Sequence, residues 1–251
     1  MKPSDPPTPN VITNDGSSPE PGAGQLIAPR WHTAIMLLLL CVPIVAGIIR
    51  QMHGQPPHAA SAAPAHPANL VRLYGQVLVY EWLLVLFVWF GVRRYGLQKL
   101  IGGNWSSPSR FFSDLGIGAL VWLAMLGIAR FLDGLLPALQ GNSINVVPQS
   151  AVEMALWISL SATAGFVEEL VFRGYLQQQF ARFGLPVAGA IALQAVVFAF
   201  GHIYEGANSV VVISVYAVMF GILAAALKNL RPGMIGHVTS DVMTIVLARS
   251  S

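Results

Sequence analysis

The sequence predicts an all-α fold, a polytopic transmembrane helical bundle of about seven transmembrane helices. Of its 251 residues, 55% are hydrophobic and only 10% are charged, whereas a soluble domain carries about 25% charged residues. The mean hydropathy is +0.62. The apolar runs are unbroken and about 20 residues long, which suits spanning helices rather than the short alternating strands of a barrel. The single cysteine, Cys41, excludes a disulfide framework.

The elements follow one another in a simple order. Residues 1–29 are rich in Pro, Ser, Gly and Asn and are predicted to be a disordered cytoplasmic segment. Residues 30–149 are predicted to hold the N-terminal transmembrane helices and loops, and residues 150–249 a C-terminal transmembrane core. Helices are expected at about 33–49, 73–92, 111–130, from Ala151 onward, 186–203, 208–228 and 233–249. Basic or Pro-containing polar loops separate these runs.

Basic residues predict the orientation, because cytoplasmic loops carry an excess of Lys and Arg. With a cytoplasmic N-terminus, the inner side holds Lys2, Arg30, Arg93, Arg94, Lys99, Arg110, Arg173, Arg182, Lys228 and Arg231. The outer side then holds only Arg50, Arg72, Arg130 and Arg249. This ratio of ten to four favours a cytoplasmic N-terminus and an outer C-terminus. The same distribution does not suggest nucleic acid binding, and we expect an integral protein of a bacterial inner membrane.

Two adjacent glutamates, Glu168 and Glu169, lie in one of the apolar segments. Ionised carboxylates in a membrane are usually paired, hydrated or functional. Arg173 follows Glu169 by four residues, the favourable order for a helical ion pair. Glu168 then points about 100° away around the helix and lacks an obvious local partner. It is either a general base that activates water or a buried carboxylate paired with Arg173 or Arg182.

A helical hairpin is predicted to bring a histidine to Glu168. Gly184 and Pro186 indicate a turn, and Glu168 precedes Gly184 by 16 residues while His202 follows it by 18. Nearly equal distances from a turn give nearly equal heights in an antiparallel pair. His202 is therefore expected to face Glu168, although a plain helix-end histidine would fit the same pattern. The predicted turn at residues 231–233 lies close to His237, which makes His237 appear shallower.

His237 and Asp241 are four residues apart and share one helix face. This spacing suits two metal ligands, or a carboxylate that fixes the tautomer of an imidazole. A carboxylate, two histidines and an arginine on apolar segments indicate hydrolytic chemistry within the membrane.

The three motifs together resemble the CPBP family of intramembrane endopeptidases, which covers CAAX proteases and bacteriocin-processing (Abi) proteins. The matching positions are Glu168-Glu169-x-x-x-Arg173, Phe198-x-x-x-His202 and His237-x-x-x-Asp241. The resemblance covers roughly residues 150–245, and the order and spacing of the motifs agree. Residues 1–110 add only membrane-spanning character.

The resemblance implies a membrane protease with a site open toward the cytoplasm. Glu168 would activate water, His202 would hold or polarise it, and His237 with position 241 would stabilise the oxyanion. Glu169 and Arg173 would support the site. Many family members have Asn where this chain has Asp241. An ionised Asp would repel an oxyanion, so Asp241 either is protonated, orients His237 or binds a metal.

Cofactor and partners follow from the same residues. Glu168, His202, His237 and Asp241 form a chemically reasonable zinc set, so the cofactor prediction is none or zinc, with the metal-free glutamate mechanism favoured. The expected partners are the bilayer and a lipidated, leader-bearing or other membrane-associated protein substrate. Two alternatives are a non-catalytic scaffold or immunity factor and a proton-coupled transporter. A transporter would be expected to have inverted repeats, which the sequence does not display.

Overall fold

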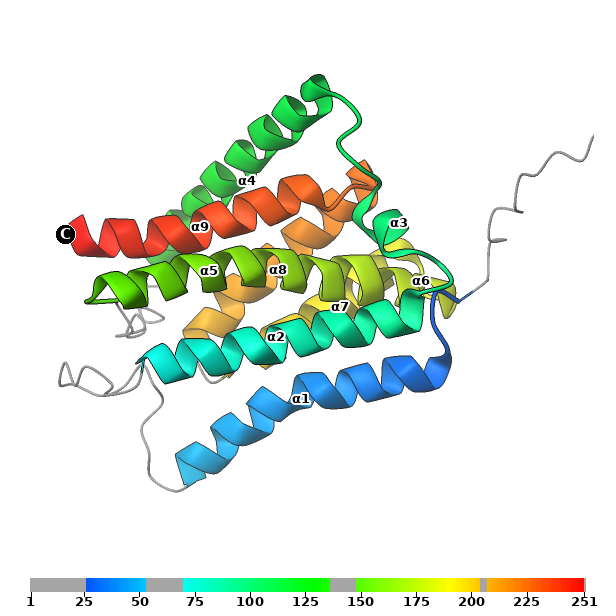
Figure 1. Cartoon of the computed structure of the whole chain (residues 1–251), viewed down its shortest axis with the longest axis horizontal. Helices are drawn as coiled ribbons and strands as arrows, with labels where there is room; N and C mark the ends of the chain where they lie inside the picture. The colour runs from blue at the N-terminus through cyan, green and yellow to red at the C-terminus, as the bar shows by residue number, and fades with distance from the viewer. Residues whose placement is uncertain (1–25, 53–69, 136–147, 204–206, 251) are drawn as a thin grey trace, which may run out of the picture.

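The computed structural model describes residues 26–52, 70–135, 148–203 and 207–250 (Figure 1). These residues confirm the all-α prediction, because they contain helices and no strand. The helices are α1 (Arg30–Met52), α2 (Leu70–Val92), α3 (Leu97–Ile101), α4 (Pro108–Leu135), α5 (Ala151–Glu168), the π-helix η2 (Glu169–Gln177), α6 (Gln178–Arg182), α7 (Val187–Gly201), α8 (Ala207–Leu227) and α9 (Arg231–Ser250). Every predicted apolar run is therefore a helix.

Within the described residues, four helices are long and apolar enough to cross a membrane. They are Leu70–Val92, Pro108–Leu132, the continuous stretch Ala151–Arg182, and Ser209–Leu227. Arg30–Ala46 and Val187–Gly201 are shorter apolar helices. The helical bundle is thus confirmed, while the full number of seven spans stays a prediction. In Figure 1, α5 lies between α2 and α9, with α1 beyond α2 and α4 beyond α9.

The first described residues of the chain pack against the helical bundle. Ile27 and Ala28 are buried, and their backbone N–H groups donate to Gln179 Oε1 at 3.1 and 3.4 Å. The Gln179 amide donates back to the Ala28 carbonyl at 2.7 Å. The prediction of disorder for residues 1–29 therefore does not hold for Ile27 and Ala28, whose backbone groups are hydrogen-bonded to Gln179. Residues 1–25 lie outside the described part of the chain.

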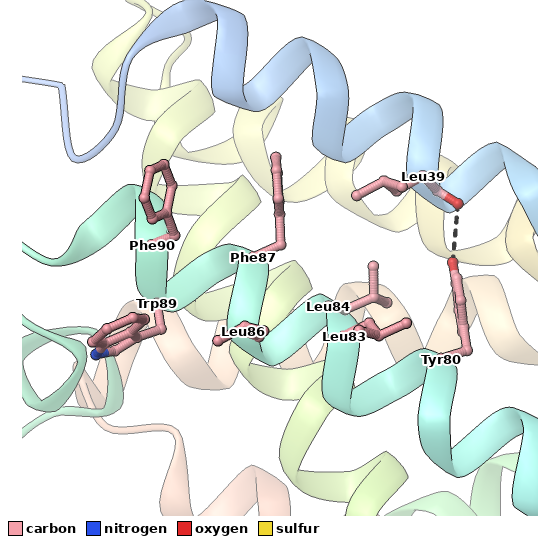
Figure 2. Close-up of a pocket in the computed structure, with 8 residues that line it drawn as sticks. All are labelled: Leu39, Tyr80, Leu83, Leu84, Leu86, Phe87, Trp89 and Phe90. Carbon is pink, nitrogen blue, oxygen red and sulfur yellow. Dashed lines mark hydrogen bonds between the residues drawn. The ribbon is translucent and has the colours of Figure 1, made fainter.

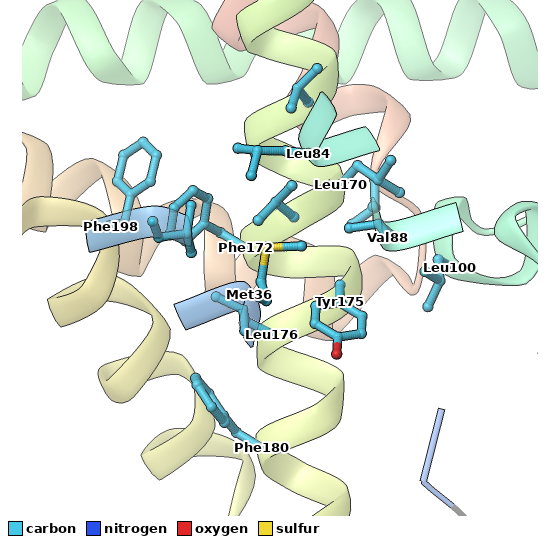
Figure 3. Close-up of a cluster of buried hydrophobic side chains, with 14 of the residues drawn as sticks. Met36, Leu84, Val88, Leu100, Leu170, Phe172, Tyr175, Leu176, Phe180 and Phe198 are labelled. Atoms are coloured by element: carbon cyan, nitrogen blue, oxygen red, sulfur yellow. The ribbon is translucent and has the colours of Figure 1, made fainter. Parts of the chain in front are cut away.

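The main apolar core surrounds η2, all of whose residues are buried. Side chains of α1, α2, α3 and α7 converge on this π-helix (Figure 3), and they include Met36, Leu84, Val88, Leu100 and Phe198. Gln177 and Gln179 are also buried, and their side-chain amides donate to backbone carbonyls. Short π-helical segments are rare and are frequent at functional sites.

Glycines let α9 approach both of its neighbours. A Cβ atom on Gly165 of α5 would lie 2.5 Å from a Val238 methyl group and 2.9 Å from the Val238 backbone nitrogen. On the α4 side, a Cβ on Gly118 would lie 2.5 Å from Ile235. Small residues at such crossings permit close packing of membrane helices. Gly165 precedes Glu168 by one helical turn, so this contact brings the neighbourhood of His237 to Glu168.

A polar cluster holds the beginning of α9. The Asp114 carboxylate accepts from Arg231 Nε at 2.7 Å, from Asn229 Nδ2 at 2.8 Å and from Trp105 Nε1 at 2.8 Å. The Leu230 N–H also donates to the Ile101 carbonyl at 2.9 Å. The turn between α8 and α9 therefore lies under α3, at residues 228–230, and α9 already begins at Arg231.

Candidate active site

The two glutamates lie where α5 becomes η2, and they face different surroundings. Glu168 is the last residue of α5 and its side chain is 20% exposed. Glu169 is the first residue of η2 and its side chain is 1% exposed. This difference agrees with the angular separation expected for adjacent helical residues. Glu168 is therefore the carboxylate that a water molecule or a substrate can reach.

Glu169 forms the ion pair predicted from its spacing to Arg173. Arg173 Nη1 lies 3.0 Å from Glu169 Oε1, and both side chains are buried. The guanidinium carbon lies 4.5 Å from the centre of the Phe198 ring and 5.2 Å from that of Phe220. Aromatic faces stabilise a desolvated guanidinium. Arg173 therefore supplies a fixed positive charge beneath the site, between two aromatic rings.

His237 connects the two glutamates. Its Nδ1 lies 3.3 Å from Glu169 Oε1, and its Nε2 lies 3.6 Å from Glu168 Oε2 and 3.9 Å from Asp241 Oδ2. The ring stacks on Phe220 at a centroid distance of 5.4 Å. A carboxylate that accepts from one imidazole nitrogen fixes which nitrogen faces the reaction. Glu169 thus holds His237 so that Nε2 faces Glu168.

His202 approaches Glu168 from α7. Its Nδ1 donates to the Phe198 carbonyl at 2.9 Å, and its Nε2 lies 4.0 Å from Glu168 Oε1. The backbone carbonyl fixes the proton on Nδ1, because a carbonyl can only accept. The predicted hairpin is correct in this respect: its turn lies at Gly184, whose φ is 101°, and it brings Glu168 and His202 to one height.

The sequence left the depth of His237 open: it is shallower than Glu168 unless the last two helices lie deeper. The structure has the second arrangement, because His237 Nε2 lies 3.6 Å from Glu168 Oε2. The turn before α9 is bound to Ile101 at the end of α3 and to Asp114. The structure therefore brings Glu168, His202 and His237 together from three helices. Asp241 joins them at the edge, with its side chain 33% exposed.

The arrangement suits the activation of water. The distances of 3.6 and 4.0 Å from Glu168 to the two imidazoles are longer than direct hydrogen bonds. Separations of this size are commonly bridged by water. A water molecule between Glu168 and an imidazole would have a carboxylate to take its proton and a ring nitrogen to orient it.

The distances between the side chains of the predicted zinc set bear on whether these residues could bind a zinc ion. Zinc draws its nitrogen and oxygen ligands to about 2.0–2.2 Å from the ion. In the described part of the chain, no three His, Cys, Asp or Glu side chains are arranged as a metal-holding group. Glu169, the remaining carboxylate, is engaged by Arg173 and His237. The donor set as it stands therefore does not fit zinc.

Sequence motifs missed one acidic side chain near the site, Glu81 on α2. It is buried at 6% exposure, and it lies near enough to Glu168, His237 and Asp241 for their charges to act on it. The signal was available, because a glutamate inside an apolar run is itself a candidate functional residue. Glu81 was overlooked because it lies outside the three motifs.

An apolar hollow lies away from these residues. Figure 2 shows a cavity of about 560 Å³ lined by Leu39 of α1 and by seven α2 side chains between Tyr80 and Phe90. The hydroxyl group of Tyr80 is occupied, because it donates to the Leu39 carbonyl at 3.1 Å. The remaining lining side chains present mainly apolar atoms to the cavity. It includes none of the predicted site residues.

Comparison with known families agrees with the geometry. Residues 150–243 match the family model described as Type II CAAX prenyl endopeptidase Rce1-like. The match confirms the resemblance to the CAAX-protease family that the three motifs predicted. The matched region contains Glu168, His202, His237 and Asp241. Searches of curated proteins and of solved structures gave no match.

Proposed function

We propose that this protein is an intramembrane endopeptidase in which Glu168 activates the attacking water. The observation that carries the proposal is the position of the partly exposed Glu168 carboxylate between His202 Nε2 at 4.0 Å and His237 Nε2 at 3.6 Å. Three separate helices supply these groups. Neither a scaffold nor an immunity factor requires such a convergence.

Each group has a defined role in the chemistry, and Glu168 acts first as base and then as acid. Glu168 takes a proton from water, and the resulting hydroxide attacks the carbonyl carbon of the scissile peptide bond. His202 orients the water through Nε2, because its Nδ1 is bound to the Phe198 carbonyl. In its doubly protonated form, His237 donates from Nε2 to the developing oxyanion. Glu168 then returns a proton to the leaving amine as the carbon–nitrogen bond breaks.

We infer the substrate class from the location and the family. A site near the cytoplasmic side of a bacterial inner membrane would act on a membrane-associated protein, such as one with a lipidated tail or a leader peptide. The proposed mechanism is of the glutamate type and needs no metal. Activity should therefore survive exhaustive chelation, whereas a zinc enzyme would lose it and recover it with added zinc.

The test compares the termini of membrane and secreted peptides in cells that express the wild type or Glu168→Gln. Peptides that stay full-length only with Glu168→Gln would support proteolysis and identify the scissile bond. Glu153→Gln is a matched control, because Glu153 is another glutamate of α5 but caps the start of that helix by accepting from the backbone N–H groups of Ser150 and Gln149. Cleavage by Glu168→Gln at the wild-type rate would overturn the role of Glu168. Identical profiles from inserted proteins would favour the scaffold or transporter alternatives.

A further inference from the structure

Glu81 lies on the face of α2 that packs against α5, close to the level of Glu168. The ring of its neighbour Trp82 lies 6.3 Å from that of Phe166, two residues before Glu168. One turn further along α2, Leu84 belongs to the same apolar cluster as Val167 and Leu170. The ring contact and the packing of α2 against both α5 and η2 place α2 alongside the junction of these two helices.

The carboxyl group of Glu81 is buried without a partner. Its Oε2 atom is inaccessible and makes no hydrogen bond to the described residues. A buried polar group without a partner is costly, and a buried unpaired charge is far more so. An unpaired carboxyl group this close to a reactive centre therefore requires an explanation, since a leucine would pack at this position without that cost.

The charge around Glu81 is predominantly negative. The charged groups of the site beside it are Glu168 on α5, Glu169 and Arg173 on η2, and His237 and Asp241 on α9. Arg173 is already paired with Glu169, and His237 lies between Glu169, Glu168 and Asp241. His202 also faces Glu168, but with its acceptor nitrogen Nε2, because Nδ1 donates to the Phe198 carbonyl. Arg173 and a protonated His237 therefore serve three carboxylates before Glu81 is counted. A fourth carboxylate in this group is best accommodated as the neutral acid.

We propose that Glu81 is a further catalytic residue of this site, a neutral carboxylic acid that donates the proton to the leaving amine. The proposal rests on the proposed protease function and refines its last step. Base and acid are then separate groups, as in other enzymes where environment divides two carboxyl groups into different roles.

The proton balance of the cycle is complete. Glu168 accepts a proton from water, and hydroxide forms the new bond to the carbonyl carbon. When the carbon–nitrogen bond breaks, the proton of Glu81 goes to the amine nitrogen and leaves a carboxylate at position 81. The proton held by Glu168 then returns to Glu81, directly or through a water molecule, and both groups regain their starting states. The net change is the addition of one water to the peptide bond.

Glu81→Gln is the decisive variant, because glutamine keeps the size and neutrality of the acid but has no transferable proton. It should insert and fold like the wild type. Cleavage of the peptides identified with Glu168→Gln should fall by about 10²- to 10⁴-fold, the usual contribution of a proton donor. The loss should appear in kcat rather than KM, and Glu81→Asp should retain part of the rate. The capping variant Glu153→Gln should show no loss. Full cleavage by Glu81→Gln would overturn the proposal.

Infrared spectroscopy tests the same residue without a substrate. The wild type minus Glu81→Gln difference spectrum at neutral pH should contain the carbonyl stretch of a protonated carboxylic acid. Glu168→Gln should change the frequency of that band, because it removes a neighbouring charge. Absence of the band, or a band indifferent to Glu168→Gln, would overturn the assignment even if the variant failed to cleave. A band that responds to Glu168→Gln in a protein that cleaves nothing would leave Glu81 in the site and instead refute the protease function.

Discussion

Glu169 is held by two partners that both depend on its charge. Arg173 Nη1 lies 3.0 Å from its Oε1, and the same oxygen lies 3.3 Å from His237 Nδ1. Arg173 is buried, and its Nε and Nη2 atoms have no other hydrogen-bond partner among the described residues. Glu169 therefore contributes to stability through its ion pair with Arg173 and to the active site through its contact with His237.

Removal of this charge should lower stability and activity together. Glu169→Gln leaves Arg173 buried and uncompensated, which we expect to cost about 3–5 kcal/mol of unfolding free energy. Thermal unfolding in detergent measures the first effect, and peptide cleavage measures the second. Glu169→Leu combined with Arg173→Leu removes both charges and should recover much of the stability. It should not recover cleavage, since His237 Nδ1 still lacks its acceptor. Recovery of both would show that Glu169 acts only through Arg173.

Asp241 differs from the other carboxylates in being one-third exposed, with Oδ2 3.9 Å from His237 Nε2. If its charge opposes the oxyanion, the neutral donor in Asp241→Asn should raise turnover at neutral pH. The pH at which turnover is greatest should also change, because one titrating carboxylate is gone. A cleavage assay across pH compares the two proteins, with Asp241→Ala as the control that removes both charge and donor. A large loss of turnover in Asp241→Asn would instead show that the carboxylate orients His237.

At the scale of the elements, close approach between α5 and α9 sets the geometry of the site. Gly165 lies against Val238, which follows His237 in the sequence. No rotamer change relieves a contact with a backbone nitrogen, so one added methyl group must separate the two helices. The helix spacing, and with it the distance from Glu168 to His237, therefore depends on a glycine that has no chemistry of its own.

Gly165→Ala should accordingly destabilise the protein despite better helix propensity. Alanine gains about 1 kcal/mol over glycine within a helix, whereas overpacking costs about 1–3 kcal/mol, and the backbone contact favours the upper part of that range. Unfolding measurements should show a lower midpoint, and cleavage should fall as His237 moves away. Gly127→Ala on α4 is the control, because its Cβ would meet no atom within 4 Å. An equal response of the two variants would contradict the packing argument.

Local sequence patterns account for the helices but not for their docking. Ser150 and Glu153 form a capping box, so the start of α5 at Ala151 is encoded nearby, and the turn at Gly184 was likewise predictable. The links from Asp114 to Arg231 and from Gln179 to Ala28 join residues more than a hundred positions apart. No local periodicity encodes such contacts. The depth of His237 and the extent of the ordered N-terminal region therefore could not be derived from the sequence.

At the scale of the whole molecule, basic residues gather at one end of the bundle. The helix termini that carry Arg30, Arg93, Arg182 and Arg231 lie at the same end in Figure 1, together with α3. The opposite end holds the start of α5 and the end of α9. A single-sided excess of Lys and Arg favours the cytoplasmic face, which would place the hairpin turn at Gly184 in the cytoplasm.

Labelling of single cysteines tests this orientation. Cys41 is the only native cysteine, so Cys41→Ser provides an unreactive background. Ser106 and Gln149 are both exposed, and they lie in connections predicted to be on the inner and outer sides, respectively. In intact cells, a membrane-impermeant thiol reagent should label Gln149→Cys and should label Ser106→Cys only after the membrane is opened. The reverse pattern would place the N-terminus outside. The site would then open away from the cytoplasm, and substrates would have to reach it from the outer side.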